Sequence, residues 1–100
     1  MAVAQVSVVP VGTAGASISH HVAHCLDILE ETGLAYELGP MGTAIEGDLR
    51  EVLEAIARMH ESTFGDGVVR VLTNVTIDDR RDRPLTMAGK LTAVRQRRGK

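Results

Sequence analysis

Glu46 is the residue whose chemistry stands out, because it is a lone carboxylate in a run of small and apolar residues, Thr43–Gly47. A carboxylate in such a run is costly to bury unless it meets a donor or a cation. It could accept hydrogen bonds from a flat heterocycle that carries N–H groups, or balance a positive charge. A solvent-facing position on a strand is the alternative. The sequence places no nucleophile–base pair and no second acid beside Glu46, so catalysis is not indicated.

Three histidines and the only cysteine lie together in residues 20–25. His20 and His24 are four residues apart and share a helix face, and two ligands at that spacing can hold zinc when a third group joins them. The sequence has no H-E-x-x-H pattern, and Cys25 falls in an apolar stripe. We therefore interpret His20, His21 and His24 as one solvated side of a helix and predict no metal site. A metal-binding protein using His20, His24 and Cys25 remains a third hypothesis.

Three other segments carry weaker signals. Residues 78–83 alternate in charge, which is typical of a solvated turn with local ion pairs or of the rim of a site. Residues 95–100 are basic, but the net charge of −2 and the aromatic content of 2% argue against nucleic acid as a partner. Residues 12–17 precede a predicted helix whose free amides could hold an anion, yet no phosphate-loop pattern follows.

Alternation and helical spacing of apolar residues predict the elements that must position these groups. The predicted strands are residues 2–11, 34–38, 43–47 and 68–78; the predicted helices are residues 17–32, about 49–62, and a third that begins at Thr86. Ser17 can cap the first helix, and Gly33 suits its C-terminal end. Asp48 and Glu51 have the spacing of a capping box for the second helix. A turn at residues 39–42 would join the second and third strands into a hairpin.

This order of elements predicts an α+β protein, a ferredoxin-like βαββαβ sandwich with an extra C-terminal helix. Right-handed crossovers would place the first and third strands in the middle of the sheet, with the fourth beside the first. Both main helices would then cover one face, where residues such as Ala4 and Val6 lie. The other face would hold a mixture of polar and apolar side chains, namely Gln5, Ser7, Glu46, Arg70, Asn74, Thr76, Val9 and Leu72. That mixture favours a subunit interface with a polar pocket in it.

Composition limits the class of protein. One hundred residues predict a single domain over 1–100, and 44% hydrophobic and 24% charged residues are ordinary for a globular protein. A single cysteine excludes an internal disulfide and favours a reducing compartment. The apolar start of the chain lacks a basic leader, and no apolar run approaches the length of a membrane span. The expected location is cytoplasmic, without membrane partners.

Blocks of sequence along nearly the whole chain carry a family resemblance. They are residues 8–13 with 17–19, then 33–36, 40–47, 59–61, 70–73 and 77–82. The Pro-Met-Gly-Thr of residues 40–43 and the Asp-Asp-Arg-Arg-Asp of residues 78–82 are the most specific of them. With these blocks the chain resembles the small thiamine-binding proteins related to YkoF. One departure is that His20 and His21 stand where an aromatic residue is expected.

The resemblance implies a ferredoxin-like fold, assembly into homodimers and commonly homotetramers, and binding of thiamine or its hydroxymethylpyrimidine moiety. Members resemble carriers or sensors of the vitamin rather than enzymes, so thiamine is the expected ligand and no cofactor is expected. The ligand-binding residues expected from motif position and strand face are Glu46, Thr43, Ser7, Asn74, Ser17 and Ser19. The alternative is an oligomeric interaction or regulatory module without a small-molecule ligand.

Overall fold

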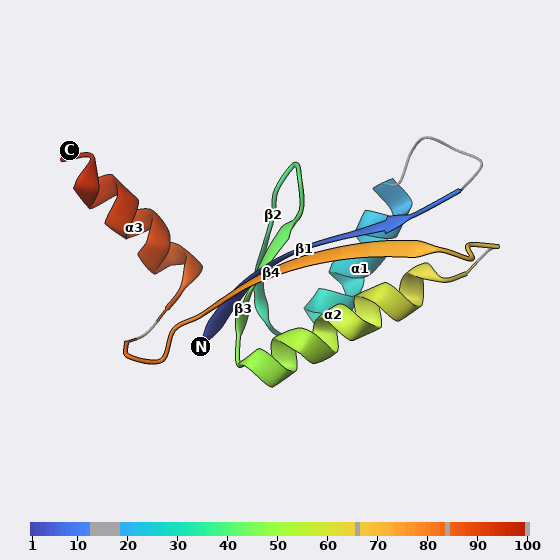
Figure 1. Cartoon of the computed structure of the whole chain (residues 1–100), viewed down its shortest axis with the longest axis horizontal. Helices are drawn as coiled ribbons and strands as arrows, with labels where there is room; N and C mark the ends of the chain where they lie inside the picture. Colours follow the sequence, from blue (N-terminus) through green and yellow to red (C-terminus); the bar gives the residue numbers. More distant parts are fainter. Residues whose placement is uncertain (13–18, 66, 84, 100) are drawn as a thin grey trace.

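The computed structural model describes residues 1–12, 19–65, 67–83 and 85–99. Its elements follow the predicted order along the chain (Figure 1). They are β1 (Ala2–Pro10), α1 (Ser19–Thr32), β2 (Ala35–Leu38), β3 (Thr43–Gly47), α2 (Leu49–Thr63), β4 (Val71–Asp79) and α3 (Met87–Arg97). No helix in these described ranges combines the length and the apolar character that a bilayer crossing requires.

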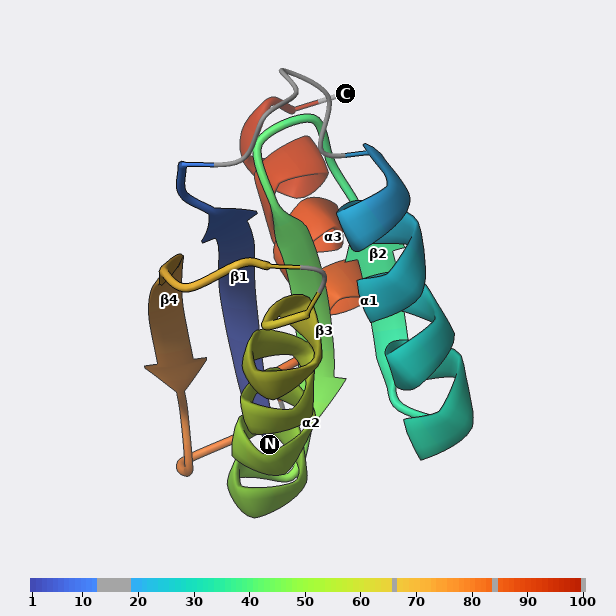
Figure 2. The ribbon, with the colours of Figure 1, turned by 90° about the vertical axis from the view of Figure 1, so that its right-hand side faces the viewer.

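The four strands form one antiparallel sheet in the order β2-β3-β1-β4, as predicted for a ferredoxin-like fold. Val6 lies opposite Thr43 on β3 and Val75 on β4, so these three residues share one face. Helices α1 and α2 cover that face, and α3 lies behind the other (Figure 2). We call the face away from α1 and α2 the open face.

The core lies between the sheet and the two covering helices, and it is aliphatic. Its buried members are Ala4, Val6, Cys25, Ile28, Leu29, Ile45, Val52, Ala55, Ile56 and Met59. The burial of Ala4 and Val6 confirms the inward face that alternation along β1 predicts. The helical spacing of apolar residues along α2 predicts that Leu53 is also buried, and this is wrong: Leu53 is 44% exposed, and Ala55 takes the inward position instead.

Two local predictions need correction. Asp48 occupies the N-cap position of α2, but its side chain makes no capping hydrogen bond; its carbonyl accepts from the Val52 amide at 2.9 Å. The Asp48 side chain is exposed, so water can form hydrogen bonds with both the carboxylate and the free amides.

Strand β4 begins at Val71 rather than at Val68, because its partner strand β1 ends at Pro10, which lies opposite Val71.

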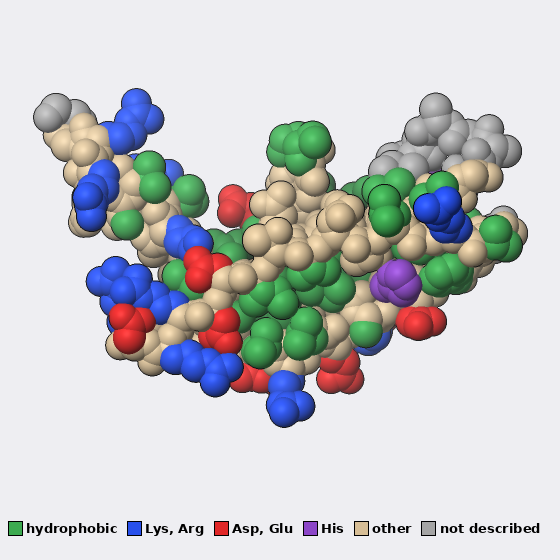
Figure 3. Space-filling view, in the orientation of Figure 1, with side chains coloured by type: hydrophobic (Ala, Val, Ile, Leu, Met, Phe, Trp, Pro, Cys, Tyr) green, Lys and Arg blue, Asp and Glu red, His purple; other side chains and the backbone are tan. Residues whose placement is uncertain are grey.

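The turn after β4 carries the local ion pairs that the alternating charges predict. Arg80 bonds to Asp82 at 2.6 Å, and Arg81 bonds to Asp79 at 2.9 Å. Figure 3 shows basic and acidic side chains interspersed at this end of the molecule, while hydrophobic side chains gather along the middle of the same view. Hydrogen bonding to the Arg80 guanidinium lowers the pKa of Asp82 to about 2.

Helix α3 begins at its N-cap Thr86, whose hydroxyl accepts from the Gly89 amide at 2.9 Å. Two contacts hold its first turn on the open face. The Met87 amide donates to Glu46 Oε2 at 2.8 Å, and Lys90 pairs with Asp78 at 2.6 Å. No residue of α3 is buried, and the helix then leads away from the sheet (Figure 1).

Candidate ligand-binding site

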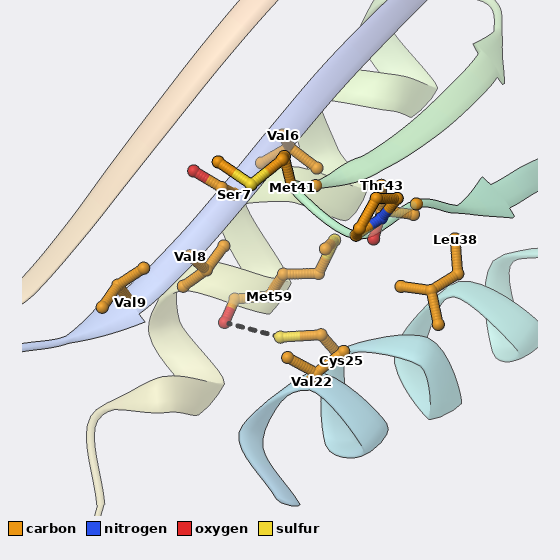
Figure 4. Close-up of a pocket in the computed structure, with 13 residues that line it drawn as sticks. Val6, Ser7, Val8, Val9, Val22, Cys25, Leu38, Met41, Thr43 and Met59 are labelled. Atoms are coloured by element: carbon orange, nitrogen blue, oxygen red, sulfur yellow. Dashed lines mark hydrogen bonds between the residues drawn. The ribbon is translucent and has the colours of Figure 1, made fainter. Parts of the chain in front are cut away.

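A cavity of about 370 Å³ opens between α1, α2, the end of β1 and the β2–β3 turn. Its walls are mainly apolar. They comprise Val6, Ser7, Val8, Val9, Val22, Cys25, Leu38, Gly39, Pro40, Met41, Gly42, Thr43 and Met59. Figure 4 shows Val22 and Cys25 reaching in from α1 and Met59 from α2, with strand and turn residues on the other sides.

The difference in strand lengths creates this cavity. Pairing between β1 and β3 stops at Val6 opposite Thr43, whereas β1 continues along β4 as far as Pro10. After Val6, the edge of β1 that faces β3 therefore has no strand partner among the residues that the structure describes. Main-chain N–H and C=O groups on such an edge are strong hydrogen-bonding groups that a ligand can use.

The turn at residues 39–42 forms the outer wall of the cavity. The Gly39 amide donates to the Gly42 carbonyl at 2.9 Å, which closes the turn. A Cβ on Gly42 would lie 3.0 Å from the Val6 carbonyl oxygen, so a larger residue would require the turn or β1 to shift by a few tenths of an ångström. Glycine at this position thus lets the hairpin approach the strand closely.

Thr43 is a hydroxyl-bearing residue in the cavity wall. It is 6% exposed and lies in one row with Val6 and Leu38, on the sheet face that the helices cover. Ser7 alternates with Val6, so it belongs to the open face and lines the cavity where β1 loses its partner. Hydroxyl groups can donate and accept hydrogen bonds, so both can serve a heterocyclic ring.

Cys25 lines the cavity and packs in the hydrophobic core. Its sulfur is 3.9 Å from the Met59 carbonyl oxygen and 4.0 Å from the Thr63 hydroxyl. Burial raises the pKa of the Cys25 thiol, so the group is neutral near pH 7 and a poor nucleophile. Cys25 contributes packing surface to this site.

The structure divides the predicted site residues between two faces of the sheet. Thr43 lies on the helix-covered face, whereas Ser7, Glu46 and Asn74 lie on the open face. Of these residues Thr43 and Ser7 line the cavity. The Glu46 carboxylate accepts from the Met87 amide and so serves the start of α3. Ser17 lies outside the described residues, and of Ser19 the structure gives only its place as the first residue of α1.

Sequence reasoning missed the apolar lining of the cavity. Val22 and Met59 lie at the helical spacing of apolar residues in their segments, a pattern that predicts core positions. Leu38 and Met41 are 53% and 82% exposed at the hairpin, and an exposed methionine in a tight turn is the signal that could have indicated a binding surface.

The histidines and Cys25 do not converge. His20 and His24 are exposed, whereas Cys25 points into the core. Within the described ranges no three His, Cys, Asp or Glu side chains come close enough to hold a metal ion.

Comparison with known proteins identifies the family of this chain. A family model described as thiamine-binding protein matches residues 4–95. The chain belongs to the thiamine-binding protein family. It is 43% identical over 98 residues to the UPF0045 protein YqgV of Bacillus subtilis, with 94% of each chain covered. It is 44% identical over 98 residues to a UPF0045 protein of Staphylococcus xylosus, with 94% of this chain and 92% of that protein covered.

Solved structures share the architecture of this chain. Protein MJ1052 of Methanocaldococcus jannaschii superposes with a TM-score of 0.85 at 38% identity, covering 93% of this chain and 94% of that one. A Thermotoga maritima protein, whose name proposes a role in thiamine biosynthesis or salvage, superposes with a TM-score of 0.76 at 18% identity, covering 93% and 97%. At that identity the likeness establishes the ferredoxin-like fold alone.

Proposed function

We propose that this protein binds thiamine, or its hydroxymethylpyrimidine moiety, non-covalently in the cavity between α1 and the β2–β3 turn. The observation that carries the proposal is the outer wall of the cavity, residues 39–43, which includes the Pro-Met-Gly-Thr segment that marks the family resemblance. A volume of about 370 Å³ lies within the range of small-molecule sites.

The lining suits the pyrimidine half of the vitamin. A flat aminopyrimidine would lie between Val22, Met59 and the strand residues. Its exocyclic amine and ring nitrogens would bond to Thr43, Ser7 or the free edge of β1. Among the described lining residues none carries a formal charge, so hydrogen bonding rather than charge pairing would orient the ring. The cationic thiazolium would extend past the rim into water, where its charge stays solvated.

A non-catalytic role as carrier or sensor follows from the same lining. General acid–base chemistry needs a titrating group near neutral pH, and the titratable side chain in the described lining is Cys25, whose pKa is raised. A cytoplasmic location would suit a free thiol and a soluble vitamin.

Self-association belongs to the proposal. The rim residues Leu38 and Met41 are exposed apolar side chains beside the cavity. A second copy in a homodimer or homotetramer would cover them and place the ligand at a subunit interface.

Calorimetry with the two halves of the vitamin tests this function. Thiamine and hydroxymethylpyrimidine should both release heat, whereas the isolated hydroxyethyl-methylthiazole should not. If the thiazole released as much heat as hydroxymethylpyrimidine, binding would not depend on the pyrimidine half of the vitamin. The absence of heat and of any thermal shift with thiamine and hydroxymethylpyrimidine at millimolar concentration would overturn the proposal.

A further inference from the structure

Val8 lies where β1 continues past the start of β3, and its main-chain groups face the β3 side of the strand. In an antiparallel pair, a residue that bonds to the residue opposite directs both its N–H and its C=O to that strand, and its neighbours direct theirs to the other side. The Val11 amide donates to the carbonyl of Arg70, the next pair in the register of β1 and β4, at 2.8 Å. Every second residue back along β1 therefore bonds to β4, and Val8 is not among them.

Two contacts on the β3 side agree with this alternation. Val6 lies two residues before Val8, and its carbonyl oxygen faces the β2–β3 turn, 3.0 Å from the place of a Cβ on Gly42. The Gly39 amide donates to the Gly42 carbonyl, so the next residue of the hairpin, Thr43, directs its main-chain groups away from β2 and toward β1. Val6 and Thr43 are opposite one another, so they form the last bonded pair between β1 and β3.

Val8 follows this last pair and offers one donor and one acceptor to the ligand cavity, which it lines (Figure 4). Within the described ranges, neither the turn nor a side chain forms a hydrogen bond with the Val8 N–H or C=O. Pro10 is the next residue of β1 with the same direction, and proline has no N–H. Val8 is thus the position on this edge of β1 that keeps both an unpaired donor and an unpaired acceptor.

We propose that the Val8 main chain selects heterocycles in which an exocyclic amine stands next to a ring nitrogen, as in aminopyrimidines. The Val8 C=O accepts from the amine, and the Val8 N–H donates to the ring nitrogen. The ligand thereby takes the place of the missing strand partner and satisfies both groups. This inference rests on the proposed function, and it adds the protein group that recognises the ligand.

Such a pair of bonds discriminates against the analogue in which a ring carbonyl replaces the amine. In that analogue the neighbouring ring nitrogen carries a hydrogen, so the order of donor and acceptor is reversed. If the ring substituent still points to the rim, the Val8 N–H meets an N–H and the Val8 C=O meets a C=O. Both main-chain groups then stay unpaired in a largely apolar cavity, which is costly.

Exchange of amide protons with water, followed by NMR, tests the proposal on the unaltered chain. In the free protein the Val8 amide should exchange readily, whereas the Val9 amide, which bonds to Leu72 on β4, should show no exchange on the same timescale. Saturating hydroxymethylpyrimidine should slow exchange at Val8 by at least about tenfold, because the ring nitrogen then accepts from that amide. A Val8 amide that is already protected in the free protein, or that exchanges equally fast at saturation, would overturn the proposal.

Two substitutions at Val8 separate its main chain from its side chain. Val8→Pro removes the N–H but no bond to β4, and β1 already carries a proline in the same orientation at Pro10, so circular dichroism should show a folded variant. Val8→Ala is the matched control, because it trims the side chain and keeps both main-chain groups. In calorimetry, Val8→Pro should bind hydroxymethylpyrimidine at least about tenfold more weakly than Val8→Ala does. Equal affinities of the two variants would contradict the proposal.

The carbonyl analogue completes the test and separates this inference from the proposed function. The wild type should bind it at least about tenfold more weakly than hydroxymethylpyrimidine. If hydroxymethylpyrimidine binds and shifts the methyl signals of Val22 and Met59, but the analogue binds equally well, the cavity is the site and Val8 does not select the ligand. If hydroxymethylpyrimidine and thiamine both fail to bind, the proposed function and this inference are both wrong.

Discussion

Replacing Glu46 with glutamine separates the two roles that its position allows. In the structure the carboxylate accepts from the Met87 amide at 2.8 Å, at the N-terminal end of α3. Glutamine keeps an acceptor oxygen but removes the charge that interacts with the helix dipole. That interaction contributes about 0.3–1 kcal/mol, so the first turn of α3 should open about two- to fivefold more often.

Hydrogen exchange of the amides of residues 87–90 measures this change, and calorimetry on the same variant measures thiamine affinity. Exchange should quicken, while affinity should stay unchanged because Glu46 lies outside the cavity lining. Glu37→Gln is the matched control: it removes the same charge from the same face but has no hydrogen bond to α3 within the described ranges. A tenfold loss of thiamine affinity in Glu46→Gln, with exchange in α3 unaltered, would refute this reasoning and place the ligand on the open face.

The cavity and the charged turn give three more predictions. Thr43→Val keeps the shape of a buried side chain and removes its hydroxyl, so thiamine affinity should fall by about 1 kcal/mol, or fivefold, in calorimetry; equal affinity would remove Thr43 from the site. The Cys25 thiol, whose pKa is raised, should react slowly with a small maleimide at pH 7, and saturating thiamine should slow it further, whereas an unaffected rate would place the ligand elsewhere. The Asp82 carboxyl should titrate near pH 2 in NMR and move toward its ordinary value of 3.8 in Arg80→Gln. Because the folded pKa is the lower one, the turn's contribution to stability is present above the unfolded pKa and is lost as the pH falls through about 2; an Asp82 midpoint that does not move in Arg80→Gln would contradict the pairing.

The sheet could be predicted from the sequence because the alternation of apolar and polar residues along β1 and β3 determines which side chains face the core. A shift of one residue would bury Gln5 and Glu46 in place of Val6 and Ile45. The order of the strands followed from the handedness of the two crossovers. Both inferences use local pattern and general topology, and the structure confirms them.

The site was harder to predict, because its geometry depends on contacts between distant segments. Glu46 accepts a hydrogen bond from the Met87 amide, 41 residues away in the sequence, and no local sequence pattern predicts that bond. The cavity exists because β1 extends beyond β3, a difference in strand length that only the paired register reveals. Leu53 illustrates the same limit: its helical spacing suited the core, but Ala55 faces inward in its place.

NMR of the methyl groups during a thiamine titration tests most directly whether the ligand occupies this cavity. The methyl signals of Val8, Val22 and Met59, which line the cavity, should shift and saturate with the calorimetric affinity, while those of Leu72 on the open face and Leu91 on α3 should stay in place. Shifts confined to Leu72 and Leu91, or no shifts at saturating thiamine, would contradict the proposal.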